Sequence, residues 1–127
     1  MSAPRPRMSR ALALAAKPIR TPVVRVESSS PVITRITIRH QRPRWQRFLG
    51  GGLHFDRTYE LDDHGRQVYD SCDGETTVTE IIARFSADNH LALAESEIAV
   101  TAFLRTLITR ELIVVPVSLE ALHDVDR

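Results

Sequence analysis

The sequence predicts an α+β domain, in which a small antiparallel N-terminal sheet is followed by a three-helix bundle and a short C-terminal strand. Three observations support this prediction. Residues 32–39 are rich in β-branched side chains, and Ile36 and Ile38 alternate with polar residues, as in a half-buried strand. After Leu61 the spacing of apolar residues changes from two to the helical period of about 3.6. A β-branched run at residues 112–115 then predicts the closing strand.

Composition predicts one soluble domain with one core, because the chain has 127 residues, of which 43% are hydrophobic and 26% charged. No apolar stretch approaches the roughly 20 residues that span a bilayer. The Ala-rich run at residues 11–16 follows several arginines but is shorter than the apolar region of roughly 7–15 residues in a signal peptide. The single Cys72 excludes an internal disulfide and fits a reducing compartment. We therefore expect a cytoplasmic location.

The N-terminal elements follow from turn and strand signals. Residues 1–17 are expected to form a basic arm, either disordered or a short helix that ends before Pro18. Residues 23–26 are expected to form a hairpin with the strand at 32–39, because Ser28 to Pro31 reads as a turn. Arg57–Leu61 alternates again and predicts a third strand.

Residues 41–49 interrupt this strand pattern. Pro43 is incompatible with a central strand, and Trp45, Phe48 and Leu49 lie at helical spacing. We expect a short helical turn that packs Trp45 onto the sheet.

The three expected helices are marked by their ends. Asp62 is a good N-cap for the first helix, and Gly74 stands where a left-handed C-terminal residue belongs. Thr77 to Glu80 forms a capping box that opens the second helix. The third begins within residues 92–95, and residues 112–115 then suit one strand of a wing. This order of strands, capped helices and strand is the plan of a winged helix-turn-helix.

Charge is distributed unevenly along the chain. Every acid except Glu27 lies after Phe55, whereas eleven of the 17 Lys and Arg residues lie before it. This asymmetry suggests a basic surface for an acidic peptide, a nucleic acid or an anionic membrane. It is also explained if the two halves neutralise each other in the folded protein.

A resemblance to a known family is carried by the segment Glu60–Gly74, which contains Leu-Asp-x-x-Gly and ends in Cys-Asp-Gly, and by residues 77–82 and 102–107. These segments resemble the PqqD-like family, named for a pyrroloquinoline quinone biosynthesis protein. We expect a PqqD-like winged-helix domain over residues 18–115 and a C-terminal tail at 116–127. Residues 17–20 and 43–45 also look like a longer subgroup of the family. Glu111 is a departure, since family members usually have Gly near this position.

The resemblance implies a non-catalytic adaptor or chaperone that captures a precursor or leader peptide and presents it to a peptide-modifying enzyme, such as a radical SAM protein. The implied mechanism is β-strand addition, with the peptide pairing along the third strand and packing into a groove beside the third helix. Arg57 and Arg105 are expected to pair with peptide acids, and Tyr59 and Ile108 to make apolar contacts. The full set of predicted peptide-binding residues is Arg57, Thr58, Tyr59, Glu60, Leu61, Thr101, Arg105 and Ile108.

The same residues suggest two alternative functions. A DNA-binding winged-helix regulator suits the fold and the N-terminal arginines, but the expected third helix carries Glu95, Glu97 and Glu111, which repel phosphate. A third reading is a basic scaffold for an anionic membrane or a partner protein. No catalytic triad, phosphate loop or metal motif is present in the sequence, and the five histidines lack ligand spacing. We therefore expect no catalytic residues, no metal and no cofactor.

Overall fold

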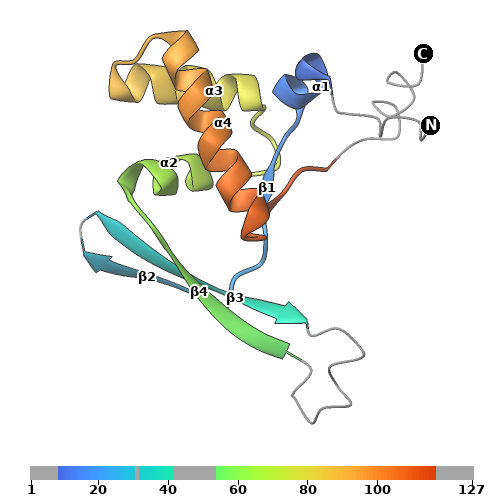
Figure 1. The fold of residues 1–127 in the computed structure, drawn as a ribbon, viewed down its shortest axis with the longest axis vertical. Helices are drawn as coiled ribbons and strands as arrows, with labels where there is room; N and C mark the ends of the chain where they lie inside the picture. Colours follow the sequence, from blue (N-terminus) through green and yellow to red (C-terminus); the bar gives the residue numbers. More distant parts are fainter. Residues whose placement is uncertain (1–8, 31, 42–53, 117–127) are drawn as a thin grey trace, which may run out of the picture. The chain divides into compact units, whose positions relative to one another are not determined.

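The computed structural model describes residues 9–30, 32–41 and 54–116. The α+β class is as predicted, with an antiparallel sheet and helices. The helical turn expected around Trp45 and the tail at 117–127 lie outside the described residues. In chain order (Figure 1), the described elements are α1 (Arg10–Ala15), β1 (Ile19–Arg20), β2 (Arg25–Ser30), β3 (Ile33–Gln41), β4 (His54–Leu61), α2 (Asp63–Ser71), α3 (Val78–Asn89), α4 (Leu93–Thr109) and β5 (Ile113–Val114).

The chain forms two compact units. One consists of residues 1–20 and 68–127 and is called the helical unit here. The other consists of residues 21–67 and is called the sheet unit.

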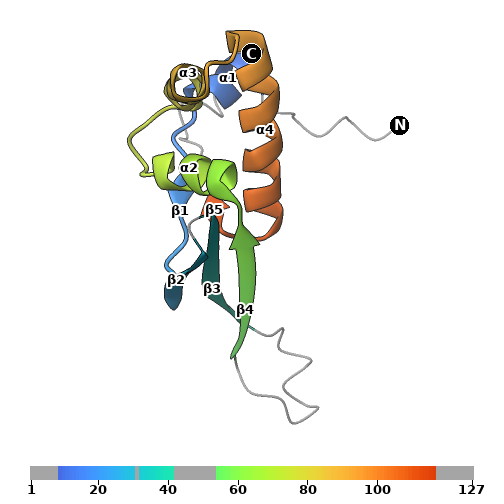
Figure 2. The same cartoon turned by 90° about the vertical axis from the view of Figure 1, so that its left-hand side faces the viewer.

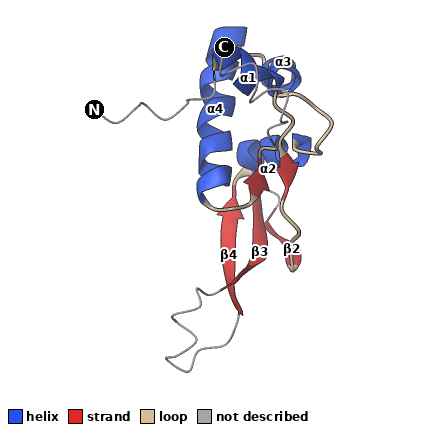
Figure 3. Cartoon of the chain, turned by 90° about the vertical axis from the view of Figure 1, so that its right-hand side faces the viewer, coloured by secondary structure: helices blue, strands red, loops and turns tan. Residues whose placement is uncertain are grey.

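The sheet unit contains an antiparallel sheet with the strand order β2-β3-β4 (Figure 3). Its register places Val26 opposite Ile36, and Ile36 opposite Tyr59. The predicted pairing is therefore confirmed, but the turn was predicted too early, because β2 continues to Ser30 and includes the residues from Ser28 that were expected to turn. The third strand is longer than predicted, since it begins at His54 and stays paired with β3 through Leu61.

The two faces of β3 differ in polarity, as strand alternation requires. Ile36 and Ile38 are buried on one face. On the other face Arg35 and Arg39 are exposed, and their Nε atoms lie 3.1 Å from carboxylate oxygens of Glu60 and Asp56 on β4. The charges of the two strands thus pair across the sheet.

Helix α2 begins as the sequence predicts. The carboxylate of Asp62 accepts a hydrogen bond of 2.7 Å from the backbone N–H of Gly65, which satisfies a donor in the first turn. Arg66 on this turn donates from Nη1 to Thr34 Oγ1 at 2.8 Å. The start of α2 is therefore tied to β3 within the sheet unit.

In the helical unit, α3 and α4 pack against each other (Figure 2). The predicted capping box is present, because Thr77 Oγ1 accepts from the backbone N–H of Glu80 and the Glu80 carboxylate accepts from that of Thr77. These hydrogen bonds also lower the pKa of Glu80 below its usual value. Helix α4 begins at Leu93, inside the predicted range. The residues of α3 and α4 buried in the protein are Val78, Ile81, Ile82, Phe85, Ser96, Val100, Leu104 and Leu107.

The N-terminal arm was expected to be either disordered or a short helix, and its described part contains the short helix α1. Ser9 caps it by accepting a hydrogen bond at Oγ from the backbone N–H of Leu12. Thr79 Oγ1 donates to the carbonyl of Leu14 at 3.0 Å, and the N–H of Val78 donates to the carbonyl of Ala16 at 3.0 Å. These bonds attach α1 to the first turn of α3.

The C-terminal strand forms as predicted, and its partner is β1. Ile19 lies opposite Val114 and Arg20 opposite Ile113. Strands β1 and β5 therefore make a separate two-stranded antiparallel sheet (Figure 2). Glu111 lies between α4 and β5 with φ of 61°, in the left-handed region. The position where the family usually has Gly therefore has a glycine-like backbone conformation in this chain.

Gly74 has the left-handed conformation that the sequence predicts, with φ of +81°. Its N–H, however, donates to the carbonyl of Pro18 at 2.9 Å. The glycine thus joins the segment before β1 to the chain after α2.

Candidate functional site

The predicted strand residues lie on β4, which is an edge strand of the three-stranded sheet. Along residues 54–61 β4 pairs with β3, and no other described strand pairs with its opposite side. An edge strand directs the N–H and C=O groups of alternate residues away from its neighbour, where a further strand can pair. The edge position of β4 is therefore the geometry that strand addition requires.

The side chains of β4 differ in their exposure. Arg57, Thr58 and Glu60 are exposed and Tyr59 is half-buried, whereas Leu61 is only 5% exposed. Leu61 therefore has little side-chain surface to offer to a ligand, and its predicted role is limited to the main chain. Thr58 Oγ1 is hydrogen-bonded to Thr37 Oγ1 at 2.9 Å.

Arg57 is positioned by an aromatic side chain. Its guanidinium carbon lies 5.6 Å from the centroid of the Phe55 ring, within the range of a cation–π interaction. Among the described residues, no carboxylate forms an ion pair with Arg57. Its charge is thus available to an acidic group of a ligand.

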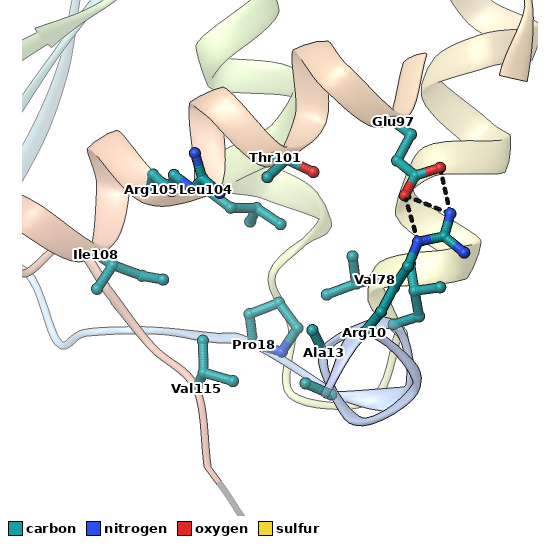
Figure 4. A pocket seen from close by; sticks show the side chains of 12 residues that line it. Arg10, Ala13, Pro18, Val78, Glu97, Thr101, Leu104, Arg105, Ile108 and Val115 are labelled. Carbon is teal, nitrogen blue, oxygen red and sulfur yellow. Dashed lines mark hydrogen bonds and ion pairs between the residues drawn. The ribbon is translucent and has the colours of Figure 1, made fainter. Parts of the chain in front are cut away.

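The predicted helix residues lie on α4 in the helical unit. Thr101, Arg105 and Ile108 are four and three residues apart, which places them along one side of the helix. All three line a groove with a volume of about 350 Å³ (Figure 4). The other walls come from α1, the segment after it, α3, α4 and the residue after β5, and they include Ala13, Leu14, Ala16, Pro18, Val78, Leu104 and Val115.

The groove is largely apolar and has an ion pair at one end. Figure 4 shows Arg10 of α1 facing Glu97 of α4, and Arg10 Nη2 lies 2.6 Å from Glu97 Oε1. Ile108 is 45% exposed, which is high for a large apolar side chain. Arg105 is exposed and forms no ion pair with the described residues. The groove therefore combines apolar walls with one available cation.

The structure thus brings the predicted residues together in two sets, one on β4 and one on α4. Sequence reasoning missed the walls of the groove that come from α1, Pro18 and Val115. The Ala-rich run at residues 11–16 was a usable signal, because small side chains on a short helix favour close packing.

Two observations concern reactive side chains in the described part of the chain. No cluster of three or more His, Cys, Asp or Glu side chains there is arranged to hold a metal ion. Burial raises the pKa of the Cys72 thiol to about 12, which makes it a poor nucleophile at neutral pH. Separately, none of the described helices has the length and apolar character to cross a membrane.

Comparison with known proteins supports the sequence resemblance. The family model described as coenzyme PQQ synthesis protein D (PqqD) matches residues 53–113, which contain β4, all three later helices and the first residue of β5. Neither the curated proteins nor the solved structures compared with the chain gave a match. The resemblance of residues 18–52 lies outside this match and stays a prediction. The family predicted from the sequence motifs is confirmed, and residues 53–113 are a PqqD-family segment.

Proposed function

We propose that this protein is a non-catalytic adaptor that captures a precursor or leader peptide by strand addition at β4 and presents it to a peptide-modifying enzyme. A PqqD-family segment indicates a peptide-binding partner protein in a pathway for ribosomally made peptides. The observation that supports the mechanism is the position of β4 at the edge of its sheet, inside the matched segment. The proposal includes a cytoplasmic location, a winged-helix fold and a radical SAM protein as one suitable partner enzyme.

Strand addition supplies affinity through the main chain and specificity through alternate side chains. On β4 the exposed Arg57 is suited to a peptide carboxylate, and the half-buried Tyr59 to an apolar side chain. On α4, Thr101, Arg105 and Ile108 offer a second set of contacts, with Arg105 as the cation and Ile108 as the apolar group. Because the two sets belong to different units, each is tested separately.

DNA binding is less well supported by this structure. Two of the arginines that suggested it, Arg35 and Arg39, have carboxylate partners at 3.1 Å. Such pairing reduces the positive potential that phosphate contacts need. We therefore retain peptide binding as the single proposed function.

A test uses the leader region of a precursor peptide encoded beside this gene, synthesised with a fluorescent label and measured by anisotropy. N-methylation of one peptide amide at a time removes a hydrogen-bond donor from the guest and leaves the protein unchanged. We expect binding to weaken about tenfold or more at alternate positions, because only every second amide of an added strand faces β4. A uniform loss, or no loss, would argue against strand addition.

Protein variants then locate the contacts. Arg57→Glu on β4, and Arg105→Glu or Ile108→Asp on α4, are each expected to weaken binding about tenfold. Arg84→Glu, which reverses an exposed charge on α3, is the matched control and should bind like the wild type. The electrostatic alternative would be favoured by a different result. In that case the protein would bind any anionic polymer, the binding would weaken steeply with salt, and Arg84→Glu would weaken it as much as the other variants do.

A further inference from the structure

The sheet unit has a second edge, formed by β2. This strand pairs with β3 on one side, and no described strand pairs with its other side. Residues Arg25 to Ser28 are all exposed. Val26 on β2 is 44% exposed, and Val24, just before the strand, is 49% exposed, so apolar surface is accessible at this edge.

The charges of β2 are symmetric about Val26. Arg25 precedes it and Glu27 follows it, and both side chains project from the same face because they are two residues apart. Arg25 Nε lies 3.4 Å from Glu27 Oε1, yet the two side chains are 64% and 53% exposed. Both charges therefore remain accessible to a partner on an adjoining strand.

We propose that β2 is a self-association edge, where two copies of this chain pair antiparallel about a twofold axis at Val26. Opposed residues of an antiparallel pair face the same side of the sheet, which restricts the possible registers. With Val26 opposite Val26, Arg25 lies opposite Glu27 on both sides of the axis. The neighbouring registers instead place Arg25 opposite Arg25, or Glu27 opposite Glu27, and like charges directly opposite are unfavourable.

This register also explains the exposed valines. Val26 meets its own counterpart on the axis, and Val24 faces Ser28 of the other copy. An interface in which the same patch serves both copies is the usual form of a twofold dimer. Because β2 has only six residues, the pairing is short, and we expect an association that depends on concentration.

The dimer leaves the β4 edge of the sheet unpaired. Joining two copies through β2 makes a continuous sheet in which each β4 is an outer strand. Self-association and peptide capture therefore use opposite edges of the sheet. The inference does not depend on peptide binding, since it is tested with the protein alone.

Sedimentation equilibrium over a hundredfold range of concentration tests the association. The wild-type mass is expected to rise from 14.3 kDa toward twice that value. Arg25→Glu and Glu27→Arg each create two like-charged pairs and should raise the dissociation constant about tenfold or more. The double variant, which exchanges the two charges, should restore it to within about threefold of the wild type. A monomeric wild type, or a double variant as weak as the single ones, would overturn the proposal.

Cross-linking tests the register independently. Val26→Cys places a thiol on the twofold axis, opposite the same residue of the other copy, and should give a disulfide-linked dimer under mild oxidation. Val24→Cys is the matched control, because its opposite residue is Ser28, and should cross-link much less. The native Cys72 is buried and does not compete. Efficient linkage through position 24 with none through position 26 would contradict the proposed axis.

Discussion

Arg20 donates a hydrogen bond of 2.7 Å from Nη1 to the main-chain carbonyl of Asp70, in the last turn of α2. Its guanidinium also lies 5.9 Å from the centroid of the Tyr69 ring, and its backbone N–H donates to the carbonyl of Cys72 at 3.1 Å. A cation near the last carbonyls of a helix is favoured by the helix dipole. One residue of β1 thus stabilises the C-terminal end of α2.

Replacement of Arg20 by Leu is expected to lower the free energy of unfolding by about 1 kcal/mol, because the carbonyl loses a charged donor at an exposed site. Arg20→Lys keeps the charge but loses the planar donor group, so it should give a smaller decrease. Urea denaturation followed by circular dichroism measures both. Equal stability of wild type and Arg20→Leu would show that solvent replaces this bond at no cost.

Gly74→Ala is expected to destabilise the protein by about 1–3 kcal/mol, the usual cost of a strained backbone position. The backbone has φ of +81°, and an added Cβ would lie 3.0 Å from Cδ1 of Ile19. Ile19→Val removes Cδ1, so combining it with Gly74→Ala should recover the steric part of the loss and leave the conformational part. Thermal denaturation of both single variants and the double variant separates the two. Simple additivity of the single effects would contradict a contact with Ile19.

The carboxylate of Asp73 should make stability depend on acid pH. It accepts hydrogen bonds from the N–H groups of Glu75 and Thr76 and from Thr76 Oγ1, and these bonds lower its pKa from 3.8 to about 2. Because the folded-state pKa is depressed, the stabilisation is present above pH 3.8 and is lost as the pH falls toward 2. The difference in melting temperature between wild type and Asp73→Asn should therefore be constant near neutral pH and shrink over that interval. A difference that does not change with pH would mean that ionisation of Asp73 is not coupled to folding.

Glu111→Gly is expected to raise the free energy of unfolding by about 0.5–1 kcal/mol. A non-glycine residue is sterically destabilised at φ of 61°, so its replacement by Gly stabilises the folded state. The larger entropy of Gly in the unfolded chain offsets only part of this stabilisation. Glu111→Ala keeps the steric cost and is the control, which should not be stabilised. Chemical denaturation of the three proteins checks the order.

The local elements were predictable from the sequence because each has a local cause. The alternation around Ile36 and Ile38, the Asp62 cap and the box at Thr77 and Glu80 all depend on residues within a few positions of one another. Pairings between distant segments have no such signal. The two residues of β1 are too few to show alternation, so their pairing with β5 was not foreseen.

The same difference between local and distant contacts applies to the candidate site. Residues 57–61 were identified from their alternation and from the family motif, whereas the start of β4 at His54 follows from its pairing with Gln41 on β3. On α4, Thr101, Arg105 and Ile108 were expected from the family resemblance, and they lie along one side of the helix. Helical spacing had no means of showing that Leu14 and Val115 line the same groove, since these residues come from remote parts of the chain.

The pairing of β1 with β5 affects how the chain is made. During synthesis, Ile19 leaves the ribosome long before Val114, its partner in the register. The helical unit therefore lacks this pairing until β5 has emerged, at synthesis rates of roughly 5–20 residues per second. Over that interval the side chain of Ile19 and the edge of its strand are without their native partner, and an unpaired strand edge favours aggregation of the nascent chain until β5 appears.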